Sequence, residues 1–308
     1  MNERHPSLIR HLKTQLNFLR KEEFVAASSG THHQVFLSKN YVLRFRDNYG
    51  LLVRETNLLK ELRHPLIPEV SWVGKAGKLG VMIENRLPGE TIDSIWKSLG
   101  DADRRKIAEG VLKFIQYLRK QKRDYFYSVK TGKKYPRFFA QLTDGIREKS
   151  RAIKEAEQAR EILKEILSVI SDPRARKLFS APSSITVVHG DLIIHNLLTD
   201  GKDLSGVLDW ELAMFGDPDY DLFRLRYYQE CAKAYQQQGI DETFESDFMD
   251  KLMTLIDTSG IIENQTLFNK KYQFVRAVFY FNALHWAVKS GNPVENTREL
   301  VNQWKNTN

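Results

Sequence analysis

Hydrophobic and polar residues alternate along Tyr41–Arg46, which places Arg44 and Arg46 on one face of a predicted strand. Residues 24–45 as a whole are typical of three short strands, and residues 69–86 of two more. Between these two regions leucines recur at helical spacing. The pattern therefore predicts an antiparallel sheet with one main helix in the N-terminal part of the chain.

The longer C-terminal part has mostly the period of amphipathic helices. A strongly charged helical stripe runs through residues 146–170, and we expect helices up to Ala181 and again from Phe223 onward. Two short apolar runs interrupt this pattern, one ending at His189 and the other comprising residues 206–208. Each run is bounded by Gly and Asp, which predicts the buried strands of a hairpin.

Composition limits the class of protein. The chain has 308 residues, of which 42% are hydrophobic, so it can bury a substantial core, and this composition argues against a disordered chain. The single Cys231 excludes an internal disulfide framework and fits a reducing compartment. No secretion signal and no apolar run of membrane-spanning length occur in the sequence. We therefore expect a cytoplasmic protein that does not enter a membrane.

The formal net charge is +8, which raises nucleic acid as a possible partner. The basic residues are dispersed, however, and acidic residues are interleaved with them through residues 147–164. No nucleic-acid recognition motif accompanies them. The charge pattern thus favours an ordinary solvated surface over nucleic-acid binding.

Oxygen-bearing side chains follow both apolar runs of the central stretch. Asp191 comes directly after His189-Gly190, Asn196 stands five positions later, and Asp209 follows the second run. Transfer of a γ-phosphoryl group requires a carboxylate that orients the acceptor hydroxyl and hard oxygen ligands for Mg²⁺. We interpret Asp191 as the base and Asn196 with Asp209 as the metal ligands.

Protein kinases have the same interval between their catalytic Asp and an Asn, followed by a later Asp for Mg²⁺. Here Gly190 stands where kinases have Arg, and Trp-Glu instead of Phe-Gly follows Asp209. No Ala-Pro-Glu triplet follows either. These departures indicate that the chain is not a protein kinase.

With these residues in view, the chain resembles the superfamily of aminoglycoside phosphotransferases and choline-kinase-like enzymes. These enzymes are small-molecule kinases that share the protein-kinase fold. The resemblance rests on VVHGDLIIHNLL, GVLDWE and GDPDYDL in this order, and upstream on YVLRF, RETNLLKEL and MIENRLPGETI. It spans roughly residues 22–225. Many members have His-Pro-Gly before the Asn, whereas this chain has Ile-Ile-His, so the loop's shape is expected to differ.

The resemblance implies an α+β, bilobal protein-kinase-like fold. Residues 1–86 would form the small nucleotide-binding lobe with its N-terminal helix, and residues 87–308 a large, mostly helical lobe. The large lobe would contain a catalytic loop at 189–196, a metal-binding segment at 206–221 and a substrate-binding helical subdomain.

The resemblance also implies a nucleotide site. Arg44 would grip the α- and β-phosphates and Glu55 would hold it, although an exposed surface pair is the alternative. Arg46 and Glu61 are the second candidates for these two roles. Ser29, Gly30 and Thr31 would form the loop that covers the phosphates. Three further residues, at the hinge, would take part in binding the purine, largely through their backbone: Glu84, Asn85 and Leu87.

Four residues are assigned supporting roles. His189 is read as a scaffold of the catalytic loop, and Glu211 as a residue that orients the metal shell or an acceptor amine, or as a plain turn carboxylate. Asp217 precedes a proline and predicts a helix N-cap. By resemblance, Asp221 is the helix aspartate that braces the catalytic loop.

The predicted activity is Mg²⁺-assisted transfer of the γ-phosphate of ATP or GTP to a hydroxyl of a small molecule. An antibiotic of aminoglycoside or macrolide type is the leading acceptor; a sugar, a choline-like amine or a homoserine-like metabolite also fits. An acidic segment at residues 241–250 could grip a polycation, or be a solvated face. A catalytically weak nucleotide-binding module is the alternative from another class. The sequence leaves open the acceptor, the choice between ATP and GTP, and the oligomeric state.

Overall fold

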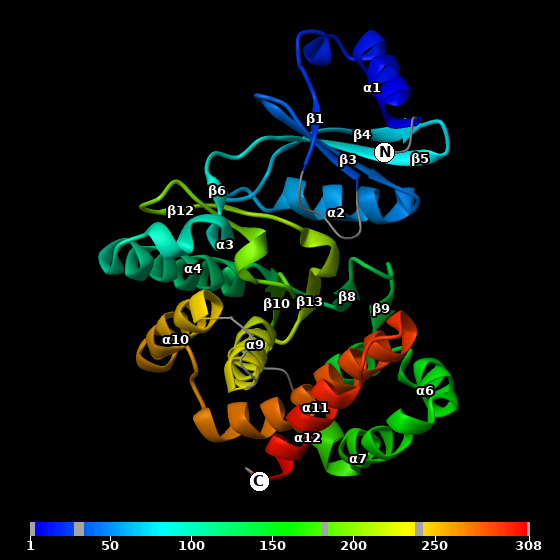
Figure 1. Ribbon diagram of the computed structural model, residues 1–308, viewed down its shortest axis with the longest axis vertical. Coiled ribbons are helices and arrows are strands. Elements are labelled where there is room, and N and C mark those ends of the chain that lie inside the picture. Colours follow the sequence, from blue (N-terminus) through cyan, green and yellow to red (C-terminus); the bar gives the residue numbers. More distant parts are fainter. Residues whose placement is uncertain (1–3, 28–33, 180–183, 238–242, 307–308) are drawn as a thin grey trace. The chain divides into compact units, whose positions relative to one another are not determined.

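The computed structural model describes residues 4–27, 34–179, 184–237 and 243–306 (Figure 1). The chain divides into two compact units that each contain several chain segments. The first unit comprises Met1–Asp103, Val129–Gly132 and Ile193–Ala213. The second comprises Arg104–Ser128, Lys133–Leu192 and Met214–Asn308.

The first unit is built on an antiparallel sheet with strand order β1-β2-β3-β5-β4. A smaller sheet has the order β12-β11-β6. The elements of this unit are α1 (Arg4–Gln15), η1 (Asn17–Leu19), β1 (Val25–Ala26), β2 (Gln34–Leu37), β3 (Tyr41–Arg46), α2 (Tyr49–Glu61), β4 (Val70–Ala76), β5 (Leu79–Asn85), β6 (Glu90–Thr91), α3 (Ile92–Ile95), η2 (Trp96–Ser98), η4 (Ile194–Asn196), β11 (Leu197–Thr199), β12 (Leu204–Val207) and η5 (Trp210–Leu212).

Alternation along β3 divides its side chains between the two faces of the larger sheet. Leu43 and Phe45 are buried in a hydrophobic cluster with Leu12 of α1. Arg44 and Arg46 therefore lie on the opposite face. In Figure 1, α1 and α2 lie on opposite sides of this sheet, so the two arginines are directed toward the α2 side. The predicted antiparallel sheet with one main helix is confirmed.

The second unit contains a sheet of five short strands and most of the helices. Its strand order is β7-β10-β13-β8-β9. The elements, beginning with a helix that starts at the end of the first unit, are α4 (Asp101–Lys120), β7 (Lys122–Arg123), β8 (Phe126–Ser128), β9 (Lys134–Tyr135), α5 (Phe138–Leu142), α6 (Ile146–Glu155), η3 (Glu157–Ala159), α7 (Arg160–Ile170), α8 (Pro173–Leu178), β10 (Ile185–Val188), β13 (Met214–Gly216), α9 (Tyr220–Gln237), α10 (Thr243–Thr258), α11 (Gln265–Ser290) and α12 (Glu295–Asn306).

Helix α11 is the centre of the helical part. It contacts α6, α7, α8, α9 and α12, and its buried residues include Phe274, Val278 and Phe281. A helix that is apolar on several sides lies inside a core rather than on a surface. The α+β class predicted from the sequence is thus confirmed.

The helices expected up to Ala181 are interrupted at residues 122–135 by three short strands, and residues 146–170 are mostly helical as expected. Residues 122–135 form β7, β8 and β9, because these strands have only two or three residues and are stabilised by pairing with β10 and β13 from later in the chain. Such short strands leave no alternating pattern in a sequence. Residues 146–170 form two α-helices, since Ala156 between them has an extended backbone.

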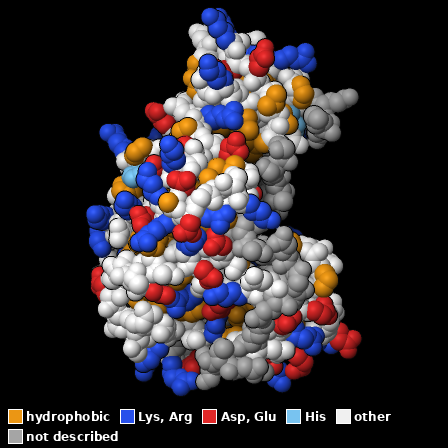
Figure 2. Space-filling model, turned by 60° about the vertical axis from the view of Figure 1, so that its left-hand side comes forward, with side chains coloured by type: hydrophobic (Ala, Val, Ile, Leu, Met, Phe, Trp, Pro, Cys, Tyr) orange, Lys and Arg blue, Asp and Glu red, His pale blue; other side chains and the backbone are white. Residues whose placement is uncertain are grey.

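On the face shown in Figure 2, Lys and Arg side chains are interspersed with Asp and Glu rather than gathered in one stripe. Within the described ranges no helix combines the length and apolarity that crossing a bilayer requires.

Candidate active site

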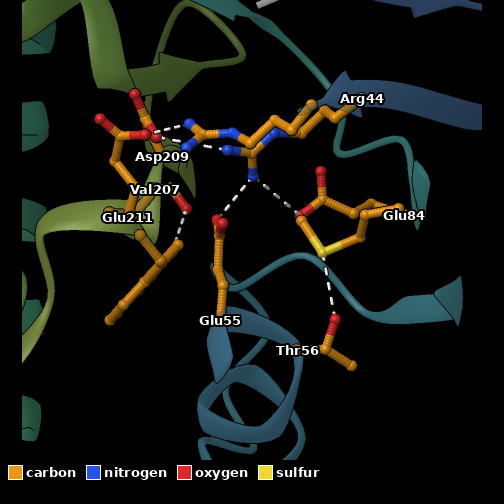
Figure 3. A network of polar contacts seen from close by, with 10 residues as sticks. Arg44, Glu55, Thr56, Glu84, Val207, Asp209 and Glu211 are labelled. Atoms are coloured by element: carbon orange, nitrogen blue, oxygen red, sulfur yellow. Dashed lines mark hydrogen bonds and ion pairs between the residues drawn. The ribbon is translucent and has the colours of Figure 1, made fainter. Parts of the chain in front are cut away.

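The first group of charged side chains is organised around Arg44 of β3 (Figure 3). Its Nη1 lies 2.6 Å from Oε1 of Glu55 on α2, and both side chains are buried. Its Nη2 lies 3.3 Å from Oδ1 of Asp209, and Nη1 lies 3.6 Å from Oε1 of Glu84. Because Arg44 and Glu55 are buried, they do not form the exposed surface pair that was the alternative interpretation.

These contacts change the acid–base properties of the group. Burial alone would lower the pKa of Arg44, but the charges of Glu55, Glu84 and Asp209 outweigh it and raise that pKa above its ordinary value. Burial raises the pKa of Glu84 to about 7, because the neighbouring carboxylates add to the effect and Arg44 offsets only part of it. The guanidinium therefore stays charged while Glu84 titrates near neutral pH.

Asn196 and Asp209 are adjacent at the open end of the β11–β12 hairpin. Leu208 donates its N–H to the carbonyl of Asn196 at 2.7 Å, and strand pairing continues from there with Leu197 opposite Val207. Asp209 has a φ of 60°, the one positive value among the non-glycine residues that the structure describes. A non-glycine residue in this conformation is strained and marks a candidate functional position.

The two residues after Asp209 are held by contacts with other parts of the first unit. Trp210 is fully buried and donates its indole N–H to the carbonyl of Val207 at 3.0 Å. Glu211 forms an ion pair with Arg46 of β3 (Figure 3). Asp209 is thus followed by two side chains with fixed positions, and neither of their contacts was predicted from the sequence.

Together these residues form what we call the arginine–carboxylate cluster: Arg44, Arg46, Glu55, Glu84, Asp209 and Glu211. With all groups ionised, four carboxylates and two guanidinium groups leave a formal charge of −2. Such an excess favours a divalent cation. No group of three or more His, Cys, Asp and Glu side chains in the described part of the chain forms a protein-only metal cage. Carboxylate oxygens such as those of Asp209 are of the donor type that Mg²⁺ prefers, together with phosphates and water.

The predicted hinge lies at the end of β5. The side chain of Glu84 faces Arg44, whereas Asn85 contacts Ser71 at 2.6 Å and Glu69 at 3.0 Å through its side chain. The backbone N–H of Asn85 donates to the carbonyl of Glu69. Leu87 is half-buried, and its side chain packs near Gly206 of β12. Purine binding by this stretch stays a prediction.

Ser29, Gly30 and Thr31 lie outside the described residues. Their predicted role as a phosphate-covering loop therefore stays a prediction as well.

A second group of side chains surrounds Asp191 in the second unit. Asp221 of α9 accepts the backbone N–H of His189 through Oδ2 at 2.9 Å and that of Gly190 through Oδ1 at 2.7 Å. Gly190 has a φ of 83°, which explains why a glycine stands where kinases have Arg. Asp191 in turn donates its N–H to Nδ1 of His189 at 3.2 Å. Asp221 and His189 thus fix the backbone of residues 189–191, and their supporting roles in catalysis stay predictions.

Two residues that the sequence analysis missed contact Asp191 directly. Arg224 Nη2 lies 2.8 Å and the Tyr228 hydroxyl 2.6 Å from Asp191 Oδ1. Burial alone would raise the pKa of Asp191, but the charge of Arg224 and the hydrogen bonds from Tyr228 and Arg224 lower it below its ordinary value. The signal that could have found them is helical spacing, since positions three and seven residues after Asp221 share its face.

Asp217 caps the start of α9 and also forms a buried ion pair. Its Oδ1 accepts the N–H of Asp219 at 3.0 Å, as an N-cap side chain does, and its carbonyl accepts the N–H of Tyr220, where α9 begins. Its Oδ2 lies 2.6 Å from Nζ of the buried Lys271 on α11. The predicted capping contact is therefore present, and the lysine from a distant helix is a partner that the sequence did not indicate.

Comparison with known proteins agrees with this geometry. Residues 23–250 match the family described as the phosphotransferase enzyme family, APH. The chain belongs to this family. It is therefore a small-molecule kinase.

Individual relatives of this phosphotransferase share little sequence with it. A segment of 52 residues is 35% identical to hygromycin-B 4-O-kinase of Escherichia coli. The segment covers 17% of this chain and 15% of that enzyme. The fold is shared over the full length. A thermostable mutant of APH(4)-Ia in ternary complex with AMP-PNP and hygromycin B has a TM-score of 0.68 at 14% identity, covering 94% of this chain and 95% of that one. The gentamicin complex of APH(2")-IIa has a TM-score of 0.66 at 17% identity, covering 99% and 97%.

The acidic segment of this phosphotransferase is partly neutralised within the second unit. Asp247 pairs with Arg104 at 3.2 Å, and Asp250 pairs with Lys233 at 3.0 Å. Residues 241 and 242 lie outside the described residues. Asp247 and Asp250 are thus paired with basic side chains of the same unit, which reduces their attraction for a polycation.

A cavity of about 200 Å³ lies between α9 and α10. It is lined by Tyr227, Tyr228, Cys231, Ala232 and Glu245. Burial raises the pKa of Cys231 to about 12, so its thiol is no nucleophile at neutral pH. Tyr228 lines this cavity and also contacts Asp191.

Proposed function

We propose that the protein transfers the γ-phosphate of ATP or GTP to a hydroxyl group of a small molecule with the help of Mg²⁺. The observation that carries the proposal is the arginine–carboxylate cluster, in which a buried Arg44–Glu55 pair lies beside Asp209. This pairing is the arrangement that phosphoryl transfer requires of a nucleotide site. The nucleotide complexes among the structural neighbours support a nucleotide cosubstrate.

Each residue has a separate role in this proposal. Arg44, held by Glu55, binds the α- and β-phosphates, because a guanidinium can grip phosphate oxygens in a fork. Asn196 and Asp209 supply oxygen ligands for Mg²⁺, which neutralises charge on the phosphates when bound. Asp191 orients the acceptor hydroxyl and accepts its proton. Ser29–Thr31 and the hinge at Glu84–Leu87 complete the nucleotide site.

For the acceptor, we propose an antibiotic of aminoglycoside or macrolide type. The family and the aminoglycosides named for the neighbouring structures, hygromycin B and gentamicin, support this choice. The net charge of +8 and the ion pairs of Asp247 and Asp250 oppose a polycation. A neutral metabolite with a hydroxyl group is therefore the second candidate. Because the cosubstrate is a nucleoside triphosphate, we place the reaction in the cytoplasm.

The test is a nucleotide-consumption assay with ATP and GTP against a panel of aminoglycosides, macrolides, sugars, choline-like amines and homoserine-like acceptors. The products are identified by mass spectrometry. Acceptor-dependent turnover that disappears in Asp191→Asn and Asp209→Asn would support the proposal. Nucleotide binding by calorimetry without turnover on any acceptor would instead indicate the catalytically weak module.

A further inference from the structure

Asp191 is held by two side chains that come from one face of α9. Arg224 and Tyr228 are four residues apart, so they are neighbours on the helix surface. Both contact the same atom of Asp191, Oδ1, at 2.8 and 2.6 Å. They also contact each other through Nη2 and the phenol hydroxyl. The three residues form a closed group, the Asp191 triad.

Arg224 is itself held firmly in place. Its guanidinium lies 4.8 Å from the ring centre of Tyr228 and 5.1 Å from that of Phe279 on α11. Its side chain is 19% exposed, and its Nε is buried without a hydrogen-bond partner. A buried guanidinium with an unpartnered N–H is costly unless its charge is balanced. Asp191 supplies that balance, so each group restricts the position of the other.

We propose that Arg224 and Tyr228 are positioning residues that fix the orientation of the Asp191 carboxylate and keep it ionised for the acceptor hydroxyl. This inference rests on the proposed function, in which Asp191 is the base. The transition state of phosphoryl transfer is loose and requires little proton abstraction early on. A well-oriented carboxylate of low basicity is therefore suited to the reaction.

Charged and titratable groups of α9 and of the loop surround Asp191. Helix α9 contributes Arg224, Tyr228, Tyr220 and Asp221, and the loop itself contributes His189. Arg224 and Tyr228 each donate a side-chain hydrogen bond to the carboxylate. Removing either donor should make Asp191 easier to protonate.

The experiment measures kcat and kcat/KM against pH for Tyr228→Phe, Arg224→Gln and Arg224→Lys, with hygromycin B, gentamicin or the panel acceptor of highest turnover. We expect kcat to fall roughly tenfold for Tyr228→Phe and more for Arg224→Gln, since each loses a hydrogen bond to a charged group. The KM for nucleotide should stay unchanged. The acidic limb of the profile should move to higher pH, and Arg224→Lys should restore part of the activity.

The control is Arg226→Gln, on the same helix. Arg226 pairs with Asp257 at 2.7 Å and does not contact Asp191. It should leave kcat and the pH profile as in the wild type. A purely structural role for Tyr228 would reduce the yield or thermal stability without moving the acidic limb. Wild-type kinetics in Tyr228→Phe across all pH values would overturn the inference.

A second measurement does not depend on the acceptor. The carboxyl ¹³C resonance of Asp191, assigned with Asp191→Asn, can be titrated by NMR in the wild type and in Tyr228→Phe. We expect a higher pKa in the variant, and equal titration curves would contradict the inference. If the wild type turns over no acceptor, the proposed function fails, while this titration still decides whether Tyr228 acts on Asp191.

Discussion

The arginine–carboxylate cluster and the Asp191 triad handle charge in opposite ways. In the first unit, Arg44 is shared by three carboxylates, and with all groups ionised the cluster has a formal charge of −2. In the second unit, Asp191 is balanced by Arg224 and hydrogen-bonded by Tyr228. An acidic excess attracts a cation, whereas a balanced pair fixes a geometry. We therefore propose that the first group binds metal and nucleotide and that the second orients the acceptor.

The largest expected effect comes from removing the base. Asp191→Asn should lower turnover by about 10²–10⁴-fold, the usual range for a general base, and leave nucleotide affinity nearly unchanged. Steady-state kinetics and calorimetry measure the two quantities. Asp257→Asn, an exposed partner of Arg226 in the same unit, is the matched control. Loss of nucleotide affinity in Asp191→Asn would contradict the proposal that nucleotide binding and acceptor orientation belong to separate groups.

Breaking the first cluster at its centre should reduce stability. Arg44→Met leaves Glu55 and Glu84 buried without their cation, which typically costs about 3–5 kcal/mol in the free energy of unfolding. Glu55→Gln should cost less, because Arg44 retains Glu84 and Asp209. Urea unfolding of both variants tests this order. Equal losses would show that the Arg44–Glu55 pair alone carries the stabilisation.

Asp209→Asn should weaken binding of the Mg²⁺–nucleotide complex. We expect at least about a tenfold loss, since even the outer partners of metal ligands typically account for 10–100-fold in affinity. Binding of the nucleotide without metal should change much less, and calorimetry with and without Mg²⁺ makes the comparison. Asp200→Asn, at an exposed turn of the same unit, is the control. An equal loss without metal would argue against Asp209 as a metal ligand.

Glu84 should make the stability of the first cluster depend on pH. Its folded-state pKa is raised to about 7 from an ordinary value of 4.5, so the native state keeps a proton that the unfolded chain has already lost. Its contribution to stability is therefore complete below about pH 4.5 and is lost as the pH rises toward 7. Glu84→Gln should be more stable than the wild type at pH 8 and equal to it near pH 4. Urea unfolding across this range measures the difference, and parallel curves would contradict the assigned titration.

The smallest expected effect concerns the charge of the acceptor. Because Arg224 neutralises Asp191, the triad by itself should not attract an ammonium group. Arg224→Gln should therefore raise kcat/KM for ammonium-bearing acceptors relative to neutral ones, even as both fall. Competition between a cationic and a neutral acceptor measures the ratio. An unchanged ratio would limit Arg224 to orienting the base.

Local sequence determined the parts of this protein that depend on short-range pattern. Alternation along Tyr41–Arg46 was enough to place Arg44 and Arg46 on one face, because strand geometry has a period of two. The intervals from Asp191 to Asn196 and Asp209, with the motifs around them, were enough to indicate the family and its fold. The long helices of the C-terminal part were predicted from the helical spacing of their apolar residues.

Only the tertiary structure decided which distant side chains meet. Arg44 reaches Asp209 across 165 positions and Asp191 reaches Arg224 across 33, and no periodicity connects residues so far apart. The short strands β7, β8 and β9 and the pairing of Asp217 with Lys271 likewise depend on partners from later in the chain. Burial then set the charge states, since the same carboxyl group has a raised pKa at Glu84 and a lowered one at Asp191. Residue type determines what a group can do chemically, and its neighbours in space determine which form it takes.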